Sequence, residues 1–259
     1  MSRRAPPAIF LTLTCPRCAR ASFPQVVVKR IDDSTIAGHF DDSFMMSWCL
    51  SEAQTSSMAD YWAIRFNREC ERRGVLAVPP GAQDDTKQAV NLRFLPAYVL
   101  DLEGVEETLG MEPYLRGAYI KHNDNDGYIS NKGHRGTDVA MAFSYFTYVA
   151  SDEELLVCDI QGVGQWFTDP QIHTASGGNF GMGNMGPEGI EAFLKTHRNN
   201  SICEVSRAKR SAPWCENLNL QDRVAPRSRA GTRPSQVRLR ARGRLGGGRA
   251  FGSGGFETR

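Results

Sequence analysis

Two aspartates and a glutamine in the middle of the chain have the residue types of a magnesium site. Asp159 closes a short apolar segment that reads as a buried strand, Gln161 follows two residues later, and Asp169 follows ten residues later. Mg²⁺ takes oxygen ligands, usually one or two carboxylates together with phosphate oxygens. The spacing is therefore compatible with a cation site, and equally with two aspartates that cap turns.

A glycine-rich stretch follows, with glycines at 181, 183, 186 and 189 and with Asn184 among them. Glycine lets the backbone turn tightly and approach a ligand closely. The stretch leads into a predicted helix over 187–197, whose N-terminal end favours anions. A dinucleotide-binding loop is excluded, because no strand of the required βαβ unit precedes this GxGxxG pattern.

A third group of candidate ligands consists of His173, His197 and Cys203. Imidazole and thiolate are the usual zinc ligands, so these three side chains would supply most of a tetrahedral site. Spacing alone favours the simpler interpretation, which is a set of buried polar residues.

The elements that must position these residues are of mixed type. Hydrophobic periodicity and turn residues predict both strands and helices, which together indicate an α+β protein. Pro96 places its strand at an edge or a bulge, because proline cannot donate to a strand ladder. The predicted strands are 25–31, 90–100, 114–120 with 128–129, and 154–160; the predicted helices are 51–73, 138–148 and 187–197.

Composition excludes some classes of protein. Of the 259 residues, 41% are hydrophobic, and no apolar run approaches the roughly 20 residues of a membrane-spanning helix. The seven cysteines are odd in number and scattered, which argues against a disulfide scaffold and for a reducing, cytoplasmic location. Cys15 and Cys18 form a lone CxxC pair that we interpret as incidental.

Charge divides the chain in two. Residues 207–259 carry thirteen Lys and Arg against three acids, a net charge of +10, whereas residues 1–206 have a net charge of −8. The Arg- and Gly-rich tail is predicted to be disordered, because it has too little apolar surface to offset the entropy of ordering. Such a tail can bind RNA or an acidic partner by charge, or simply remain solvated. The expected domains are a divergent start over 1–24, a body over 25–206 and the tail over 207–259.

Several long motifs, taken in order, resemble the atypical alpha-kinase family, which includes myosin heavy chain kinases, elongation-factor-two kinase and the channel-kinases. The resemblance covers roughly residues 25–205. The motifs are Val27–Lys29, Ala63–Asn67, Glu112–Lys121, Ala142–Tyr148, Glu154–Gly164, Thr168–Thr174 and Phe180–Gly189.

The resemblance implies a two-lobed protein kinase fold, with ATP and Mg²⁺ in the cleft and a structural zinc in the C-terminal lobe. It implies that Lys29 holds the ATP phosphates, that Glu112 and Tyr114 belong to the hinge on the adenine side, and that Asp159 is the catalytic aspartate. Gln161 and Asp169 match the Mg²⁺ ligands. The residues that match the loop beside the phosphates are Gly181, Gly183, Asn184 and Gly186.

The chain departs from the family at the zinc motif. His173, His197 and Cys203 match as ligands, but Asn199 stands where a cysteine is expected. Tyr145, where the family often has histidine, is a smaller departure away from these ligands. Three outcomes are open: weakly held zinc with an outside ligand, replacement of the missing thiolate by Cys215, or no zinc. Because few residues precede Lys29, we also expect a shortened N-terminal lobe.

The leading functional hypothesis is a cytoplasmic serine/threonine kinase that uses ATP and Mg²⁺ to phosphorylate a protein substrate. The alternative is a catalytically impaired pseudokinase scaffold whose basic tail binds RNA or an acidic partner. Retention of Lys29, Asp159, Gln161 and Asp169 favours the first hypothesis, and Asn199 motivates the second.

Overall fold

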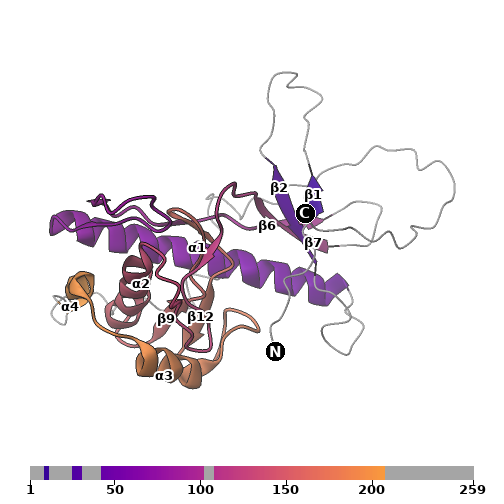
Figure 1. Ribbon diagram of the computed structural model, residues 1–259. Coiled ribbons are helices and arrows are strands. Elements are labelled where there is room, and N and C mark those ends of the chain that lie inside the picture. The colour runs from indigo at the N-terminus through magenta and orange to yellow at the C-terminus, as the bar shows by residue number, and fades with distance from the viewer. Residues whose placement is uncertain (1–8, 12–24, 31–41, 102–107, 208–259) are drawn as a thin grey trace, which may run out of the picture.

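The computed structural model describes residues 9–11, 25–30, 42–101 and 108–207 (Figure 1). The predictions for the Cys15–Cys18 pair, for Cys215 and for nearly all of the basic tail lie outside these residues. The described part is an α+β structure, as the sequence predicts, and it contains two main sheets.

The first sheet carries the candidate lysine. Its antiparallel strands lie in the order β1 (Ile9–Leu11), β2 (Val26–Lys29), β7 (Thr108–Pro113) and β6 (Tyr98–Asp101). Side chains alternate across a strand, so Val26 and Val28 lie on one face and pack with Leu100 and Met111 in a small core. Lys29 therefore lies on the opposite face.

The long helix α1 (Asp42–Arg72) contacts both sheet regions. In Figure 1 the first sheet lies above one half of this helix, and α2 lies below the other half. Its apolar residues follow helical spacing and are fully or nearly fully buried, as expected for a core-facing stripe. They are Ala59, Trp62, Ala63, Phe66 and Cys70. The helix begins nine residues before the predicted start at 51, because Met45 and Cys49 extend the buried stripe toward the N-terminus.

The second sheet has the order β5 (Arg93–Phe94), β11 (Trp166–Thr168), β10 (Gln161–Val163) and β8 (Ile120–Lys121). Beside it, β9 (Leu155–Cys158) pairs with β12 (Gln171–Thr174), and β3 (Leu76–Ala77) pairs with β4 (Gln88–Ala89). The remaining helices are α2 (Thr137–Ala150), α3 (Gly186–Thr196), the 3-10 turn η1 (Ser201–Cys203) and α4 (Glu204–Arg207).

A cluster of buried aromatic rings joins α1, α2 and the second sheet. Phe66 and Phe143 have ring centroids 5.7 Å apart, and Phe94 lies 5.7 Å from Phe143 and 5.5 Å from Phe167. These centroid distances lie in the range in which aromatic pairs attract beyond the burial of their area. The cluster therefore fixes α1 and α2 against the strands that carry the candidate site.

Two strand predictions are corrected by the structure. The predicted strand 90–100 is interrupted around Pro96: β5 precedes the proline and joins the second sheet, whereas β6 follows it and joins the first. Of the predicted strand 114–120, only Ile120 is in a strand, β8. The helices predicted over 138–148 and 187–197 are confirmed to within two residues at each end. No helix of the described residues is long and apolar enough to cross a membrane.

Candidate active site

Three polar side chains stand in one row across the second sheet. Gln161 on β10 is directly opposite Lys121 on β8 and Thr168 on β11. Residues directly opposite in antiparallel strands project from the same face of a sheet. The row therefore places an ammonium, an amide and a hydroxyl side by side at one edge of the site.

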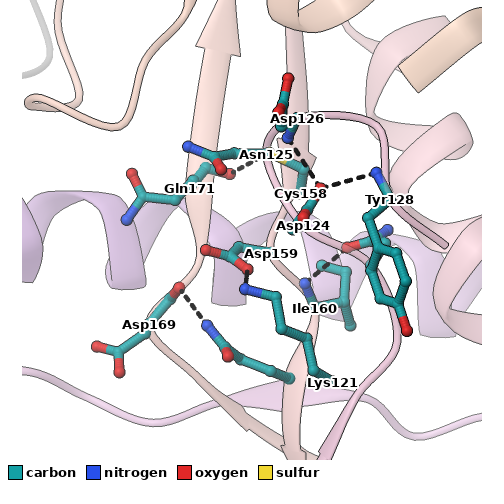
Figure 2. A network of polar contacts seen from close by, with 12 residues as sticks. Lys121, Asp124, Asn125, Asp126, Tyr128, Cys158, Asp159, Ile160, Asp169 and Gln171 are labelled. Atoms are coloured by element: carbon teal, nitrogen blue, oxygen red, sulfur yellow. Dashed lines mark hydrogen bonds and ion pairs between the residues drawn. The ribbon is translucent and has the colours of Figure 1, made fainter. Parts of the chain in front are cut away.

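Asp159 lies next to this row, directly after the buried strand β9. Its φ of 58° is in the left-handed region, which aspartate tolerates better than most residues and which turns the chain sharply after the strand. Its carboxylate forms an ion pair with Lys121 (Figure 2), and its side chain is 13% exposed. Burial raises the pKa of Asp159, and the hydrogen bond and charge of Lys121 oppose that rise.

Asn123 holds the backbone beside Asp159. Its side-chain oxygen accepts the N–H of Ile160 at 2.8 Å, and its amide nitrogen donates to the Ser144 hydroxyl at 3.1 Å. Both Asn123 and Ser144 are buried. This link ties the turn at Asp159 to helix α2.

Lys29, Glu112 and Asp169 form a second charged group. The Lys29 ammonium lies 2.8 Å from a carboxylate oxygen of Glu112 and also pairs with Asp169. The Thr168 hydroxyl donates to the same oxygen of Glu112. Burial tends to lower the pKa of Lys29, but the two carboxylates outweigh it, so that the pKa lies above its usual value and the side chain stays charged.

These charges line a cleft between α1 and the first sheet. The cleft encloses about 310 Å³, part of it open to solvent. Lys29, Glu112 and Asp169 line it together with Glu52 from α1. Burial, with the neighbouring charge of Asp169, raises the pKa of Glu52 to about 7. Three carboxyl groups and one ammonium group therefore line this cleft. This excess of acidic groups would attract a cation or a cation-bound ligand.

The glycine-rich loop reaches the same region, and Asn184 holds it together. The Asn184 side chain accepts the N–H groups of Thr174 and Gly186 at 3.1 and 2.9 Å and donates to the Thr174 hydroxyl at 2.8 Å. Gly181 has a φ of 78°, and a Cβ there would lie 2.7 Å from the Ser51 hydroxyl on α1. The Asn184 side chain is therefore used inside the loop, which it shapes; its predicted contact with a ligand stays a prediction.

The hinge residues lie at the end of β7. Tyr114 follows this strand, is 38% exposed, and donates its backbone N–H to the Gln25 carbonyl at 2.8 Å. The carboxylate of Glu112, which was assigned to the adenine side, is directed instead at Lys29 and Thr168. Contacts of Glu112 and Tyr114 with a nucleotide stay predictions.

The predicted zinc ligands do not come together as a set. The two ring nitrogens of His173 lie 2.9 Å from the Asn125 carbonyl oxygen and 3.0 Å from the Met185 N–H nitrogen. His197 and Cys203 are close to each other, with 3.7 Å between Nε2 and Sγ. Among the described residues, no group of three or more His, Cys, Asp or Glu side chains is arranged to hold a metal ion. The assignment of His173 to such a group is therefore corrected.

The predicted Mg²⁺ ligands Gln161 and Asp169 lie next to each other. The Gln161 side-chain nitrogen donates to the Asp169 backbone carbonyl at 3.4 Å, a bond that does not use the amide oxygen. The Asp169 side chain is 39% exposed. One amide oxygen and one or two carboxylates suit Mg²⁺, which takes its other ligands from water and phosphate.

Motif reasoning missed several residues of this site. Lys121 and Thr168 stand in the sequence analysis only as the ends of motifs, and Asn123 is not singled out there. Lys121 and Thr168 become recognisable through their register beside Gln161. Glu52 carries no local signal, because one acid on a long helix is ordinary.

Comparison with known proteins gives a consistent match. A family model described as the alpha-kinase family matches residues 21–203. The chain is 36% identical over 179 residues to myosin heavy chain kinase C of Dictyostelium discoideum. The aligned region covers 68% of this chain and 19% of that protein. It is 40% identical over 174 residues to eukaryotic elongation factor 2 kinase of Caenorhabditis elegans, covering 66% and 20%. The chain thus spans about a fifth of the length of these relatives.

Solved structures agree with the sequence match. The alpha-kinase domain of myosin heavy chain kinase A in complex with ADP superimposes with a TM-score of 0.55 and 28% identity. That match covers 72% of this chain and 65% of the other. The same domain in complex with AMPPCP gives a TM-score of 0.53 at 27% identity.

Proposed function

Because this chain belongs to the alpha-kinase family, we propose that it is a protein kinase that transfers the γ-phosphoryl group of ATP to a serine or threonine. The observation that carries the proposal is convergence in space. Lys29 comes from β2, Asp159 follows β9 and Asp169 follows β11, yet Asp169 pairs with Lys29 and adds its charge to that of Asp159. Phosphoryl transfer needs such positioned charges more than it needs covalent chemistry.

Asp159 is the group that receives the substrate proton. As the hydroxyl oxygen bonds to the γ-phosphorus, the bond from that phosphorus to the bridging oxygen breaks, and the hydroxyl proton passes to the Asp159 carboxylate. A carboxylate with a raised pKa is a stronger base than an exposed one, which favours this step. Lys121 keeps the carboxylate oriented through their ion pair.

Lys29 supplies positive charge to the nucleotide phosphates. Glu112 holds the ammonium in the cleft, and Thr168 in turn holds Glu112. A charged group fixed before the reaction stabilises the developing negative charge without reorganising. Mg²⁺, which neutralises phosphate charge when bound, would be held by Gln161 and Asp169.

The test is a transfer assay on the purified chain. Radiolabelled ATP, Mg²⁺ and a basic protein substrate are incubated with the wild type, with Asp159→Ala and with a matched control, Glu191→Gln, at an exposed site on α3. We expect labelled phosphoserine or phosphothreonine with the wild type and the control, and none with Asp159→Ala. Transfer that persists unchanged in Asp159→Ala would overturn the proposal. A folded wild type that binds ATP without turnover would favour the scaffold alternative.

A further inference from the structure

The segment after helix α3 carries two zinc-type donors in contact. His197 directly follows α3 and Cys203 ends the turn η1, and both are buried. Their Nε2–Sγ distance of 3.7 Å is a non-bonded contact that a shared metal would also allow. A structural zinc site needs four such donors in tetrahedral geometry, so the other two positions decide whether zinc fits.

Aromatic rings pack against the His197 ring. The ring of Tyr145, on α2, stacks on the His197 ring with centroids 4.7 Å apart and an interplanar angle of 15°. Phe193, one turn earlier on α3, also stacks on it, at 5.1 Å and 20°. We call Tyr145, Phe193 and His197 the aromatic stack. It packs α2 against the end of α3.

Hydrogen bonds of the Asn200 side chain hold the rest of the segment in place. The side-chain oxygen of Asn200 accepts the N–H groups of Ile202 and Cys203, at 2.9 and 3.2 Å. Its amide nitrogen donates to the Asp138 carbonyl on α2 at 2.9 Å. The turn η1 is thereby capped and tied to α2 by protein groups alone.

The donor set does not suit zinc. A phenol at Tyr145 and a neutral amide at Asn199 are poor ligands beside a thiolate and an imidazole. His173 is no substitute, because its ring nitrogens contact the Asn125 carbonyl oxygen, the Cys158 thiol and the Met185 N–H, and not His197 or Cys203. Among the described side chains, His197 contacts Cys203 and His173 contacts Cys158, but no third donor joins either pair.

We propose that the C-terminal lobe of this chain is held together without zinc, the aromatic stack and the Asn200 hydrogen bonds replacing a structural metal. The positions that departed from the family motif, Tyr145 and Asn199, are then not defects. Tyr145 has become part of the packing, and the segment no longer depends on metal supply. This proposal is independent of whether the chain transfers phosphate.

The first experiment measures zinc directly. The full chain is expressed with added zinc, desalted, assayed by atomic emission, and melted with and without the chelator phenanthroline. We expect far less than one zinc ion per chain and an unchanged melting temperature. About one zinc per chain, with a melting temperature that falls on chelation, would overturn the proposal. Cys215→Ser would then show whether the tail completes the site.

A gain-of-function variant gives the converse test. Tyr145→His combined with Asn199→Cys adds an imidazole and a thiolate beside His197 and Cys203. We expect this variant to bind about one equivalent of zinc, and of cobalt with the visible absorption of a tetrahedral thiolate site, while the wild type shows neither. A wild type that gives the same cobalt spectrum would contradict the proposal, and this comparison needs no activity measurement.

The aromatic stack has its own matched pair of variants. Tyr145→Phe keeps the ring and should leave the melting temperature nearly unchanged, whereas Tyr145→Ala should lower it by several degrees. Equal melting temperatures for Tyr145→Ala and the wild type would show that the stack does not hold the lobe. These two variants also remain informative if the double variant fails to fold.

Discussion

Lys29 and Glu112 are diagonal neighbours on one face of the β2–β7 strand pair, with the ammonium 2.8 Å from the carboxylate. Glu112 is directly opposite Val27, so two residues along β2 bring Lys29 within reach of its side chain. The pairing of adjacent strands therefore decides that this acid holds the lysine. Glu112 also links the two sheets, because the Thr168 hydroxyl on the second sheet donates a hydrogen bond to it.

Removing the Lys29 charge is expected to weaken nucleotide binding. Lys29→Met keeps much of the side-chain volume but leaves the buried Glu112 carboxylate without its ammonium partner. We expect the affinity for ATP with Mg²⁺ to fall at least about tenfold, a loss of about 1.4 kcal/mol. Titration calorimetry measures this, with Lys195→Met on the exposed face of α3 as the control. Equal affinities for Lys29→Met and the wild type would contradict the role of Lys29.

Asn123 is expected to act as a positioning residue for Asp159. Asn123→Ala leaves the buried N–H of Ile160 and the Ser144 hydroxyl without this partner, and should cost about 1–3 kcal/mol of unfolding free energy. Turnover should fall more than nucleotide affinity, because Lys29 and Asp169 are untouched. Ser144→Ala is the matched variant, since it removes one hydrogen bond but leaves the Ile160 link. If both variants reduced turnover equally, the Ile160 link would not be the important one.

Glu69 is expected to give the fold a pH dependence. Hydrogen bonds from Arg72, and from Arg73, hold the pKa of Glu69 at about 2, below its ordinary value of 4.5. A carboxylate with a lowered pKa stabilises the folded state above its unfolded pKa, and this contribution is lost as the pH falls through the folded pKa. Glu69→Gln should therefore be less stable than the wild type at pH 7, and the difference should shrink from about pH 4.5 toward pH 2. Urea unfolding at several pH values measures it; a difference independent of pH would contradict the assignment.

The aromatic core is expected to dominate stability. Phe143 is fully buried and contacts the rings of Phe66 and Phe94. Phe143→Ala should lower the free energy of unfolding by about 3–5 kcal/mol, through lost burial and the cavity it leaves. Leu194→Ala, at a position that is 36% exposed, is the control and should cost far less. Similar losses for both variants in chemical denaturation would show that the cluster is not the centre of the core.

Much of the fold followed from local patterns. The helices over 137–150 and 186–196 and the strand before Asp159 have clear apolar spacing, so sequence alone predicted them. The start of α1 was missed, because Met45 and Cys49 become part of its buried stripe only when the first sheet and the rest of the fold are in place. The strand around Pro96 was predicted as one piece because periodicity cannot show that a chain passes from one sheet to another.

The sequence by itself determined the family and the identity of the candidate catalytic and magnesium-binding residues, because these lie in long ordered motifs whose residue types carry the chemistry. Only the tertiary structure decided their partners. Asp169 meets Lys29 across 140 residues of chain, and Lys121 meets Asp159 because β8, which carries Lys121, pairs with β10, which begins two residues after Asp159. It likewise set Tyr145, rather than His173, against His197. Contacts between distant segments depend on strand register and helix packing, which no local spacing records.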